Sequence, residues 1–132
     1  MKFLKVFIFS VLLCVPVLPG GSAEEQPPDI PALIEQLKGW DRDAIQKASD
    51  RLFEIGEPAV PFLIKALKNE DPGIRNRAAR LLGDLQAEEA IEPLAGLLDD
   101  HKYWVTRSAV YSLGNIATPE TVPPLKKALQ HY

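Results

Sequence analysis

The sequence predicts an all-α fold, a stack of about three and a half helix pairs that follows a signal peptide. The first observation is an internal repeat with a period of about 30 residues, which is typical of solenoids. The second is that apolar residues within each repeat recur at helical spacing, with no sustained alternation that would indicate strands. The third is a charged, then apolar, then small-residue pattern at the N-terminus.

The first 23 residues contain the three parts of a secretory signal. Two lysines precede an apolar run, and small residues follow at Gly21 and Ala23, the positions that a signal peptidase inspects. We expect cleavage after Ala23 and no stable membrane insertion, because the apolar run is short and interrupted by prolines. The alternatives are an uncleaved anchor and a lipoprotein modified at Cys14, although the bulky Leu13 before this cysteine argues against lipidation. The protein is therefore expected to be exported, and periplasmic or extracellular.

Composition excludes several classes of function for the mature chain. The only cysteine, Cys14, is lost with the signal peptide, so neither thiol catalysis nor a disulfide is available. Removal of Lys2 and Lys5 changes the net charge from −3 to −5, since −3 − 2 = −5. A chain of this charge outside the cytoplasm is a poor nucleic-acid binder, so no nucleic-acid partner is expected.

Seven segments carry the repeat, in two alternating kinds that we call A and B helices. The B segments are WDRDAIQKASDRLFEIG at 40–56, EDPGIRNRAARLLGDL at 70–85 and HKYWVTRSAVYSLGNI at 101–116. When the three B segments are aligned, several positions are apolar in all of them and are expected to be buried. One such column contains Ala48, Ala78 and Ala109, and another contains Leu52, Leu82 and Leu113. The A segments IPALIEQLKG, VPFLIKALKN, IEPLAGLLDD and VPPLKKALQH align in the same way, with Leu33, Leu63, Leu94 and Leu125 in one column.

These columns predict the order of elements and the domain boundaries. Helices are expected near 31–38, 43–55, 58–68, 72–85, 88–98, 103–116 and 119–130. A signal peptide at 1–23 and a short linker at 24–28 precede a repeat domain at 29–132. Its repeats are expected at about 29–56, 57–86, 87–117 and, in part, 118–132.

Helix ends are marked by capping residues and prolines. Asp71 precedes a proline and is expected to cap the following helix, and Glu57 and Thr118 are interpreted in the same way. Gly56 is expected to end the preceding helix. Pro93 lies within an A segment and is expected to kink or restart its helix.

The motif Asp71-Pro72-x-x-Arg75-x-x-Ala78-Ala79-x-x-Leu82-Gly83-x-Leu85 resembles the short HEAT-like repeat of the phycobilisome-lyase type, and the resemblance covers roughly residues 29–132. The third repeat departs from the motif, with Lys102 and Thr106 aligned to Asp71 and Arg75. The first has Phe53 where the others have Gly83 and Gly114. The resemblance implies a right-handed α-α superhelix of antiparallel helix pairs whose B helices line a concave binding surface. It implies no single function, because this fold hosts scaffolds, assembly factors and a few enzymes.

Enzymatic signatures are missing, so the protein is expected not to be an enzyme. The HEAT-like deoxyhypusine hydroxylases hold a di-iron centre with His-Glu pairs, and this sequence has none. His101 and His131 are expected to be solvated, and no metal or cofactor is expected. Bilin lyases share the repeat type but work in the cytoplasm, at odds with the signal peptide. The carboxylate pairs 88–89 and 99–100 are expected to be solvated charges.

Three arginines in one B segment, Arg75, Arg77 and Arg80, are expected to be mostly structural. Arg75 lies one helical turn after Asp71, so an ion pair between them is expected. Arg80 is the exception, because its column contains Asp50 and Tyr111 on a face away from the apolar stripe. Tyr and Arg are enriched among the residues that dominate binding energies, so this column is the candidate contact. The adjacent exposed columns complete the candidate face with Glu54, Asp84 and Asn115, and with Gln46, Asn76 and Arg107.

A second group of aromatic residues lies at the turns between A and B helices. Trp40, Tyr103 and Trp104 are expected to fill gaps between neighbouring repeats, as aromatic residues at turns commonly do. Tyr103 and Trp104 are adjacent and cannot easily both be buried, so one of the pair, with Trp104 as the candidate, is expected to be exposed for contact.

The sequence therefore predicts an exported, non-catalytic scaffold or assembly module that binds a protein or peptide with its concave face. The alternative is an accessory factor to an enzyme, lyase-like, that handles a cofactor or a metal. A third interpretation is a truncated or minimal repeat array that has no partner of its own.

Overall fold

The computed structural model describes residues 27–130; the expected signal peptide and His131 lie outside this range. Within it, the chain forms only helices, which are α2 (Ile30–Glu35), α3 (Arg42–Ile55), α4 (Val60–Ala66), α5 (Pro72–Asp84), α6 (Ile91–Gly96), α7 (Tyr103–Ile116) and α8 (Val122–Gln130). Short 3₁₀ turns precede or extend the A helices and are η1 (Glu57–Ala59), η2 (Glu88–Ala90), η3 (Leu97–Asp99) and η4 (Pro119–Thr121). The all-α prediction and the three and a half helix pairs are confirmed.

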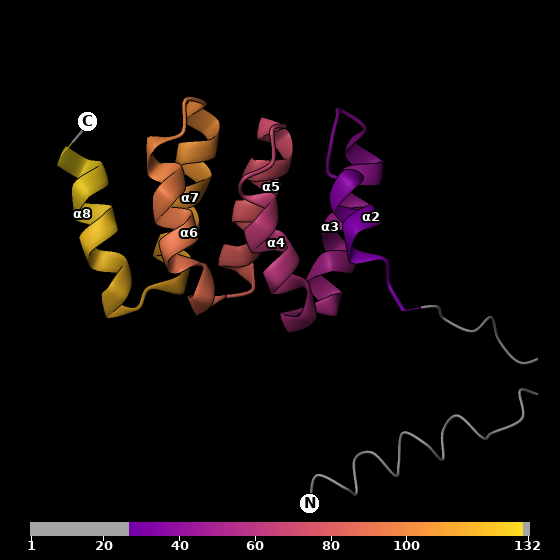
Figure 1. The fold of residues 1–132 in the computed structure, drawn as a ribbon, viewed down its shortest axis with the longest axis horizontal. Helices are drawn as coiled ribbons and strands as arrows, with labels where there is room; N and C mark the ends of the chain where they lie inside the picture. The colour runs from indigo at the N-terminus through magenta and orange to yellow at the C-terminus, as the bar shows by residue number, and fades with distance from the viewer. Residues whose placement is uncertain (1–26, 131–132) are drawn as a thin grey trace, which may run out of the picture.

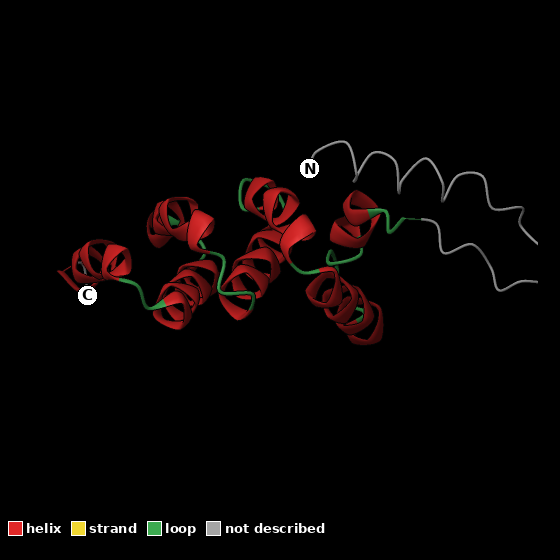
Figure 2. Ribbon diagram, turned by 90° about the horizontal axis from the view of Figure 1, so that it is seen from below, coloured by secondary structure: helices red, strands yellow, loops and turns green. Residues whose placement is uncertain are grey.

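The helices stand side by side in two rows. Figure 1 shows the helix pairs following one another from the N-terminal to the C-terminal end. Seen from below in Figure 2, α2, α4 and α6 form one row and α3, α5 and α7 the other, with α8 at the C-terminal end. The first row consists of the A helices and the second of the B helices. The expected right-handedness of the stack stays a prediction.

Capping aspartates begin two of the three B helices, and one of them, Asp71, is the cap that the sequence predicts. The Asp71 side chain accepts hydrogen bonds from the N–H groups of Gly73, at 2.8 Å, and Ile74, at 3.1 Å. Asp41 does the same for α3. At α7 the N-cap residue is Lys102, which forms no side-chain cap. The third repeat, which has Lys102 where the motif has Asp71, therefore lacks the side-chain cap of the other two.

The predicted side-chain caps of the A helices are wrong. Glu57 is the first residue of η1 and the preceding Gly56 is its N-cap, without a side-chain hydrogen bond. Thr118 precedes η4, and its side chain does not cap that turn. In a 3₁₀ turn the backbone carbonyl before the turn accepts the N–H three residues later. The Gly56 carbonyl accepts from Ala59 and that of Thr118 from Thr121, so no side chain is needed.

Glycine and proline mark the remaining helix ends. Gly56 ends α3 with a φ of 70°, a conformation that glycine adopts without the steric cost of a Cβ. The helix around Pro93 restarts as expected, because the η2 turn gives way to α6 at Ile91. Pro93 then lies in the first turn of α6, where a missing N–H breaks no helical hydrogen bond.

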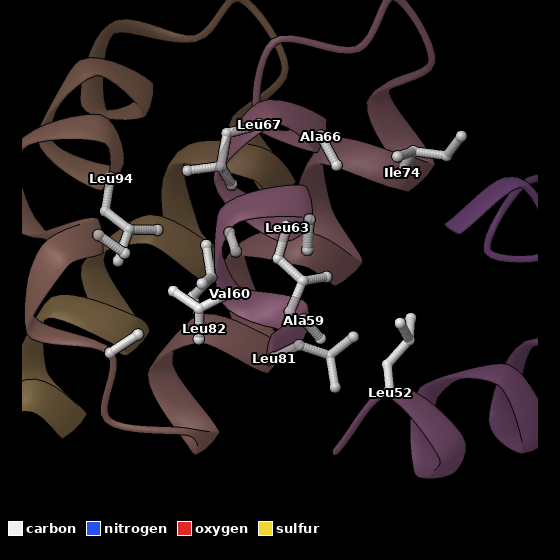
Figure 3. Packing of buried hydrophobic residues seen from close by; sticks show 14 of the residues in the cluster. Leu52, Ala59, Val60, Leu63, Ala66, Leu67, Ile74, Leu81, Leu82 and Leu94 are labelled. Atoms are coloured by element: carbon white, nitrogen blue, oxygen red, sulfur yellow. The ribbon is translucent and has the colours of Figure 1, made fainter. Parts of the chain in front are cut away.

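The core lies between the two rows, where the aligned leucines meet. Leu63 and Leu94 from the A helices, and Leu52, Leu82 and Leu113 from the B helices, are each 0% exposed. Figure 3 shows buried apolar side chains of this core between neighbouring helices, with Leu52, Leu63, Leu82 and Leu94 among those labelled. Burying one such side chain contributes about 1.5–3 kcal/mol, so stacking of the repeats supplies the main stabilising term.

A buried ion pair joins the second repeat to the third. Arg75 Nε and Nη2 donate to the two carboxylate oxygens of Asp100, at 2.9 and 3.2 Å, and both side chains are less than a tenth exposed. Arg75 Nη1 also donates to the carbonyls of Asn69 and Glu70. The predicted Arg75–Asp71 pair is therefore wrong, and so is the expectation that Asp100 is solvated. The Arg75 side chain extends across the repeat boundary, and the Asp71 carboxylate is occupied as the helix cap.

The surroundings of Asp100 stabilise its ionised form. Burial acts to raise the pKa of this carboxyl group. Hydrogen bonds from Arg75 and from the Lys102 N–H, together with the charge of Arg75, outweigh burial and hold the pKa below its ordinary value. The Asp100 carboxylate therefore remains ionised at neutral pH. The other acidic residues of the two carboxylate pairs, Glu88, Glu89 and Asp99, are exposed as expected, and so is His101.

The first repeat is joined to the second in a different way. Arg77 on α5 donates from Nη1 to the carbonyl of Leu37, at 2.5 Å, and from Nη2 to that of Gly39, at 3.4 Å. Both carbonyls follow the C-terminal end of α2, where helical carbonyls lack partners within the helix. Arg77 is thus structural, as expected for this arginine cluster.

Candidate binding groove

The spacing of the B helices is set by small residues between α5 and α7. A Cβ added at Gly83 would lie 2.6 Å from the Cα of Ser112, so only glycine fits at this crossing. The Ser112 hydroxyl is buried and donates to the carbonyl of Ala79 on α5, at 2.7 Å. Asn76 on α5 also accepts a hydrogen bond from Ser108 on α7. The two helices therefore pack in direct backbone contact.

The equivalent crossing between α3 and α5 contains large side chains. Phe53 occupies the Gly83 position of the first repeat, and Leu81 occupies the Ser112 position of the second. α5 packs against α3 far less extensively than against α7, and Figure 2 shows the wider spacing. The side chain of Phe53 is 50% exposed in the space that results. A bulky pair thus replaces a small pair and holds α3 away from α5.

The space between α3 and α5 is a groove of about 440 Å³. Its apolar wall consists of Ile45, Phe53 and Leu81. Its polar residues come from both helices and are Gln46, Ser49, Asp50, Asn76, Arg77, Arg80 and Asp84. We call this space the α3–α5 groove. A second hollow of similar volume continues from it toward α7, because Phe53 and Asp84 line both, joined there by Gly83, Gln86 and Asn115.

The structure brings the predicted central residues together. The Arg80 guanidinium carbon lies 5.6 Å from the ring centroid of Tyr111, within the range of a cation–π interaction between α5 and α7. Asp50 lies across the α3–α5 groove from this pair and accepts a hydrogen bond from Gln46, at 2.7 Å. The register inferred from the repeats therefore places these three residues in sequence across the B-helix row.

The other predicted residues differ in position. Asp84 and Asn115 line the groove and its continuation, whereas Glu54 is exposed and pairs with Arg51 in its own helix, at 3.1 Å. Arg107 is exposed in the first half of α7. Trp104 lies in the first turn of α7, at the opposite end of that helix from Asn115, so it does not belong to the groove.

The turn aromatics do not fill gaps between repeats, contrary to the expectation. Trp40 is 95% exposed, Tyr103 66% and Trp104 50%. Lys102 Nζ lies 5.5 Å from the centroid of the Trp104 ring, so the lysine side chain partly covers that ring. The aligned leucines already close the space between neighbouring repeats, so these rings extend outward. The expectation that one of Tyr103 and Trp104 is exposed holds for both.

The charges of the groove are not all compensated. Within residues 27–130, neither Asp50 nor Asp84 has a lysine or arginine nitrogen within 4.0 Å, the limit for a salt bridge. The two arginines of the groove have other contacts, since Arg77 donates to backbone carbonyls and Arg80 stacks on Tyr111. The groove thus presents two carboxylates without an ion-pair partner and two arginines engaged in other contacts, beside an apolar wall.

A larger hollow, of about 750 Å³, lies between α2 and α4 on the A-helix row. It is mainly apolar, lined by residues such as Ile34 and Phe62, with Glu35, Lys65 and Lys68 among its polar residues. Binding sites usually combine an apolar surface with several convergent polar groups, and the α3–α5 groove fits that description better. The described part of the chain contains no cluster of three or more potential metal ligands. None of its helices has the length and apolarity needed to cross a bilayer.

Two features escaped the sequence reasoning. Phe53 departs from the glycine column, and this departure is the signal for the groove that the sequence contains. Its effect on the spacing of α3 and α5 is visible only in the structure. Asp100 was interpreted as one of a pair of solvated carboxylates, because nothing local distinguishes it from Asp99.

Comparisons with known proteins agree with this architecture. The family of HEAT repeats matches residues 30–114 and again 74–132. The chain is 38% identical over 86 residues to phycocyanobilin lyase subunit alpha of Synechococcus elongatus, covering 59% of this chain and 32% of that protein. It is 34% identical over 88 residues to the uncharacterized protein SkfG of Bacillus subtilis, covering 65% and 51%.

Solved structures give the same result. The complex of CpcE and CpcF of phycocyanin lyase from Nostoc sp. matches with a TM-score of 0.64 and 30% identity, covering 76% of this chain and 63% of that chain. Human deoxyhypusine hydroxylase matches with a TM-score of 0.61 at 24% identity, covering 93% of this chain and 46% of that chain, which shows the shared fold alone. The chain spans about a third to a half of the length of the curated relatives that it matches. It belongs to the HEAT-repeat family, with repeats of the lyase type.

Proposed function

We propose that the protein is an exported, non-catalytic module that binds a protein or peptide across its B-helix row. The observation that carries this proposal is the continuous polar surface formed by Asp50, Arg80 and Tyr111, which three successive B helices contribute. Arg and Tyr side chains that are held by each other yet remain accessible are typical of residues that dominate binding energies. A preformed surface also loses little conformational entropy when a partner binds.

The relatives support a protein partner. One of the matching solved structures is a complex of two proteins, CpcE and CpcF. A HEAT-like chain of this type thus forms an assembly in at least one relative, and a role for this chain in an assembly is consistent with that. Export rests on the N-terminal pattern of lysines, apolar residues and small residues.

Affinity capture tests this function. The protein is immobilised and incubated with an envelope extract, beside the variant Arg80→Glu/Tyr111→Ala. The matched control is Arg42→Glu/Tyr103→Ala, which makes the same chemical changes at exposed positions outside the groove. We expect a partner to be retained by the wild type and the control and lost by the first variant. Loss with the control alone would move the binding surface to the turn edge and contradict the proposal.

A second candidate function is that of an accessory factor to a lyase-type enzyme. The observation that favours it is the 38% identity to a phycocyanobilin lyase subunit. Phycocyanobilin added to the purified protein would then show an induced visible circular dichroism band. An unchanged spectrum, together with a melting temperature that divalent metals do not raise, would exclude a cofactor- or metal-handling role.

A further inference from the structure

The α3–α5 groove exists because the first repeat lacks the small residues that let neighbouring B helices pack closely at the next repeat boundary. Gly83 and Ser112 bring α5 and α7 into backbone contact, whereas Phe53 and Leu81 hold α3 away from α5. In the described part of the chain, this crossing is the one that has a large residue at both positions. The groove is therefore a local feature of one repeat boundary, which is a property expected of a specificity-determining subsite.

The apolar wall of the groove determines which apolar side chain of a bound segment can pack there. Phe53 is half exposed and Ile45 partly buried, so an incoming apolar side chain would cover them. Leu81 is already buried at the base of the groove. A side chain of the size of leucine would remove this surface from water, which is the main favourable term in such contacts.

The charged side chains of the groove determine which charge the bound segment should carry. Among residues 27–130, no cationic side chain lies within 4.0 Å of the Asp50 or Asp84 carboxylate. The two arginines that line the groove are directed to the Leu37 and Gly39 carbonyls and to the Tyr111 ring. An incoming cation would pair with these two carboxylates, which have acceptor oxygens to offer. The two guanidinium groups keep their positive charge, but their donors are already engaged by carbonyls or turned to the Tyr111 ring. A guanidinium fits best, because its planar donors can bond a carboxylate through two nitrogens at once.

We propose that the α3–α5 groove selects a peptide segment in which an arginine or lysine neighbours a leucine-sized apolar residue. The apolar side chain packs on Phe53 and Ile45, and the cation pairs with Asp50 and Asp84. This inference rests on the proposed function, since it names the chemistry of the partner segment bound there. The competing outcome is an acidic segment attracted by Arg77 and Arg80.

Titrations with short peptides followed by NMR test this proposal. The full chain is expressed with ¹⁵N label and purified as the cell processes it. The probes are the capped peptide Gly-Ser-Leu-Arg-Ser-Gly and two versions of it, one with glutamate for arginine and one with serine for leucine. We expect amide shifts along α3 and α5 with the first peptide, and binding at least about tenfold weaker with each of the others.

Two variants and one control locate the binding. Asp50→Asn/Asp84→Asn removes the carboxylates at little cost to folding, because both residues are exposed, and should weaken binding of the arginine peptide about tenfold. Ser49→Trp fills the groove without changing its charge and should abolish binding. Glu88→Gln/Glu89→Gln makes the same change in net charge at exposed positions in η2 and should bind as the wild type.

The outcomes separate this inference from the function on which it rests. Equal or stronger binding of the glutamate peptide, or unchanged affinity in Asp50→Asn/Asp84→Asn, overturns the cation preference. If capture from the extract still depends on Arg80 and Tyr111 in that case, the proposed function stands and only the inference fails. If neither capture nor peptide binding involves the B-helix row, both fail.

Discussion

Gly83 on α5 and Ser112 on α7 lie in backbone contact, so closely that no side chain carbon fits between them. Their hydrogen-bonded neighbours, Ala79 and Asn76 on α5 and Ser108 on α7, hold the same crossing. This contact makes the second and third repeats one tightly packed unit, whereas α3 of the first repeat packs less closely on α5 across the groove.

Gly83→Ala should destabilise the protein by about 1–3 kcal/mol, because the added Cβ overlaps the Ser112 backbone and forces α5 and α7 apart. The free energy of unfolding is measured by urea denaturation followed by circular dichroism. Gly114→Ala is the matched control, since it changes the equivalent helical glycine where nothing lies within 4 Å. It should be neutral or stabilising by up to ~1 kcal/mol. Equal effects of the two substitutions would contradict the close approach.

Asp100→Ala should cost about 3–5 kcal/mol of stability, because it leaves the Arg75 guanidinium buried without its carboxylate. Asp99→Ala, at the exposed neighbour, should stay within about 0.5 kcal/mol of the wild type. Arg75→Met/Asp100→Ala should cost less than the sum of the single changes. A double-mutant cycle of urea denaturation measures this coupling, and additive effects would show that the pair does not act as a unit.

Acid should weaken the protein through the same pair. The pKa of Asp100 is lowered in the folded state relative to its ordinary value of 3.8, so the unfolded state binds protons more readily. The stabilisation from Asp100 is present above the unfolded pKa and is lost as pH falls through the folded pKa. Unfolding free energies measured from pH 7 down to strongly acidic pH should converge for wild type and Asp100→Asn at the acidic end. A constant difference across the range would contradict the lowered pKa.

Arg77→Met should loosen the first repeat alone, because the carbonyls of Leu37 and Gly39 lose their donor. Amide hydrogen exchange resolved by residue measures this effect. Exchange should accelerate in α2 and α3 and stay unchanged where α5 packs on α7. Arg107→Met, an exposed arginine on α7, serves as the control and should leave the exchange pattern as in the wild type. Uniform acceleration across the stack would show that Arg77 supports the whole fold.

Much of the candidate site could be predicted from repeat register. Aligning the B segments placed Arg80 and Tyr111 in one column, and the structure has their side chains in contact. Register works here because helices of equal length, stacked at a constant period, bring equivalent positions side by side. Register gave no prediction for Trp40, Tyr103 and Trp104, because these residues belong to no aligned column of the B-helix face. The expectation that they fill gaps between repeats rested on their position near turns, and it was wrong because all three are exposed.

The sequence by itself determined the helices, their order and the buried columns, because each depends on neighbours within a few positions. Asp71 caps its helix because an acceptor side chain precedes a proline at the helix start. Leu52, Leu82 and Leu113 are buried because the apolar residues recur at helical spacing. Only the tertiary structure decided that Arg75 pairs with Asp100 rather than Asp71, and that Phe53 opens a groove. Both depend on the distance between helices of different repeats, which is set jointly by the residues on the two sides of each boundary.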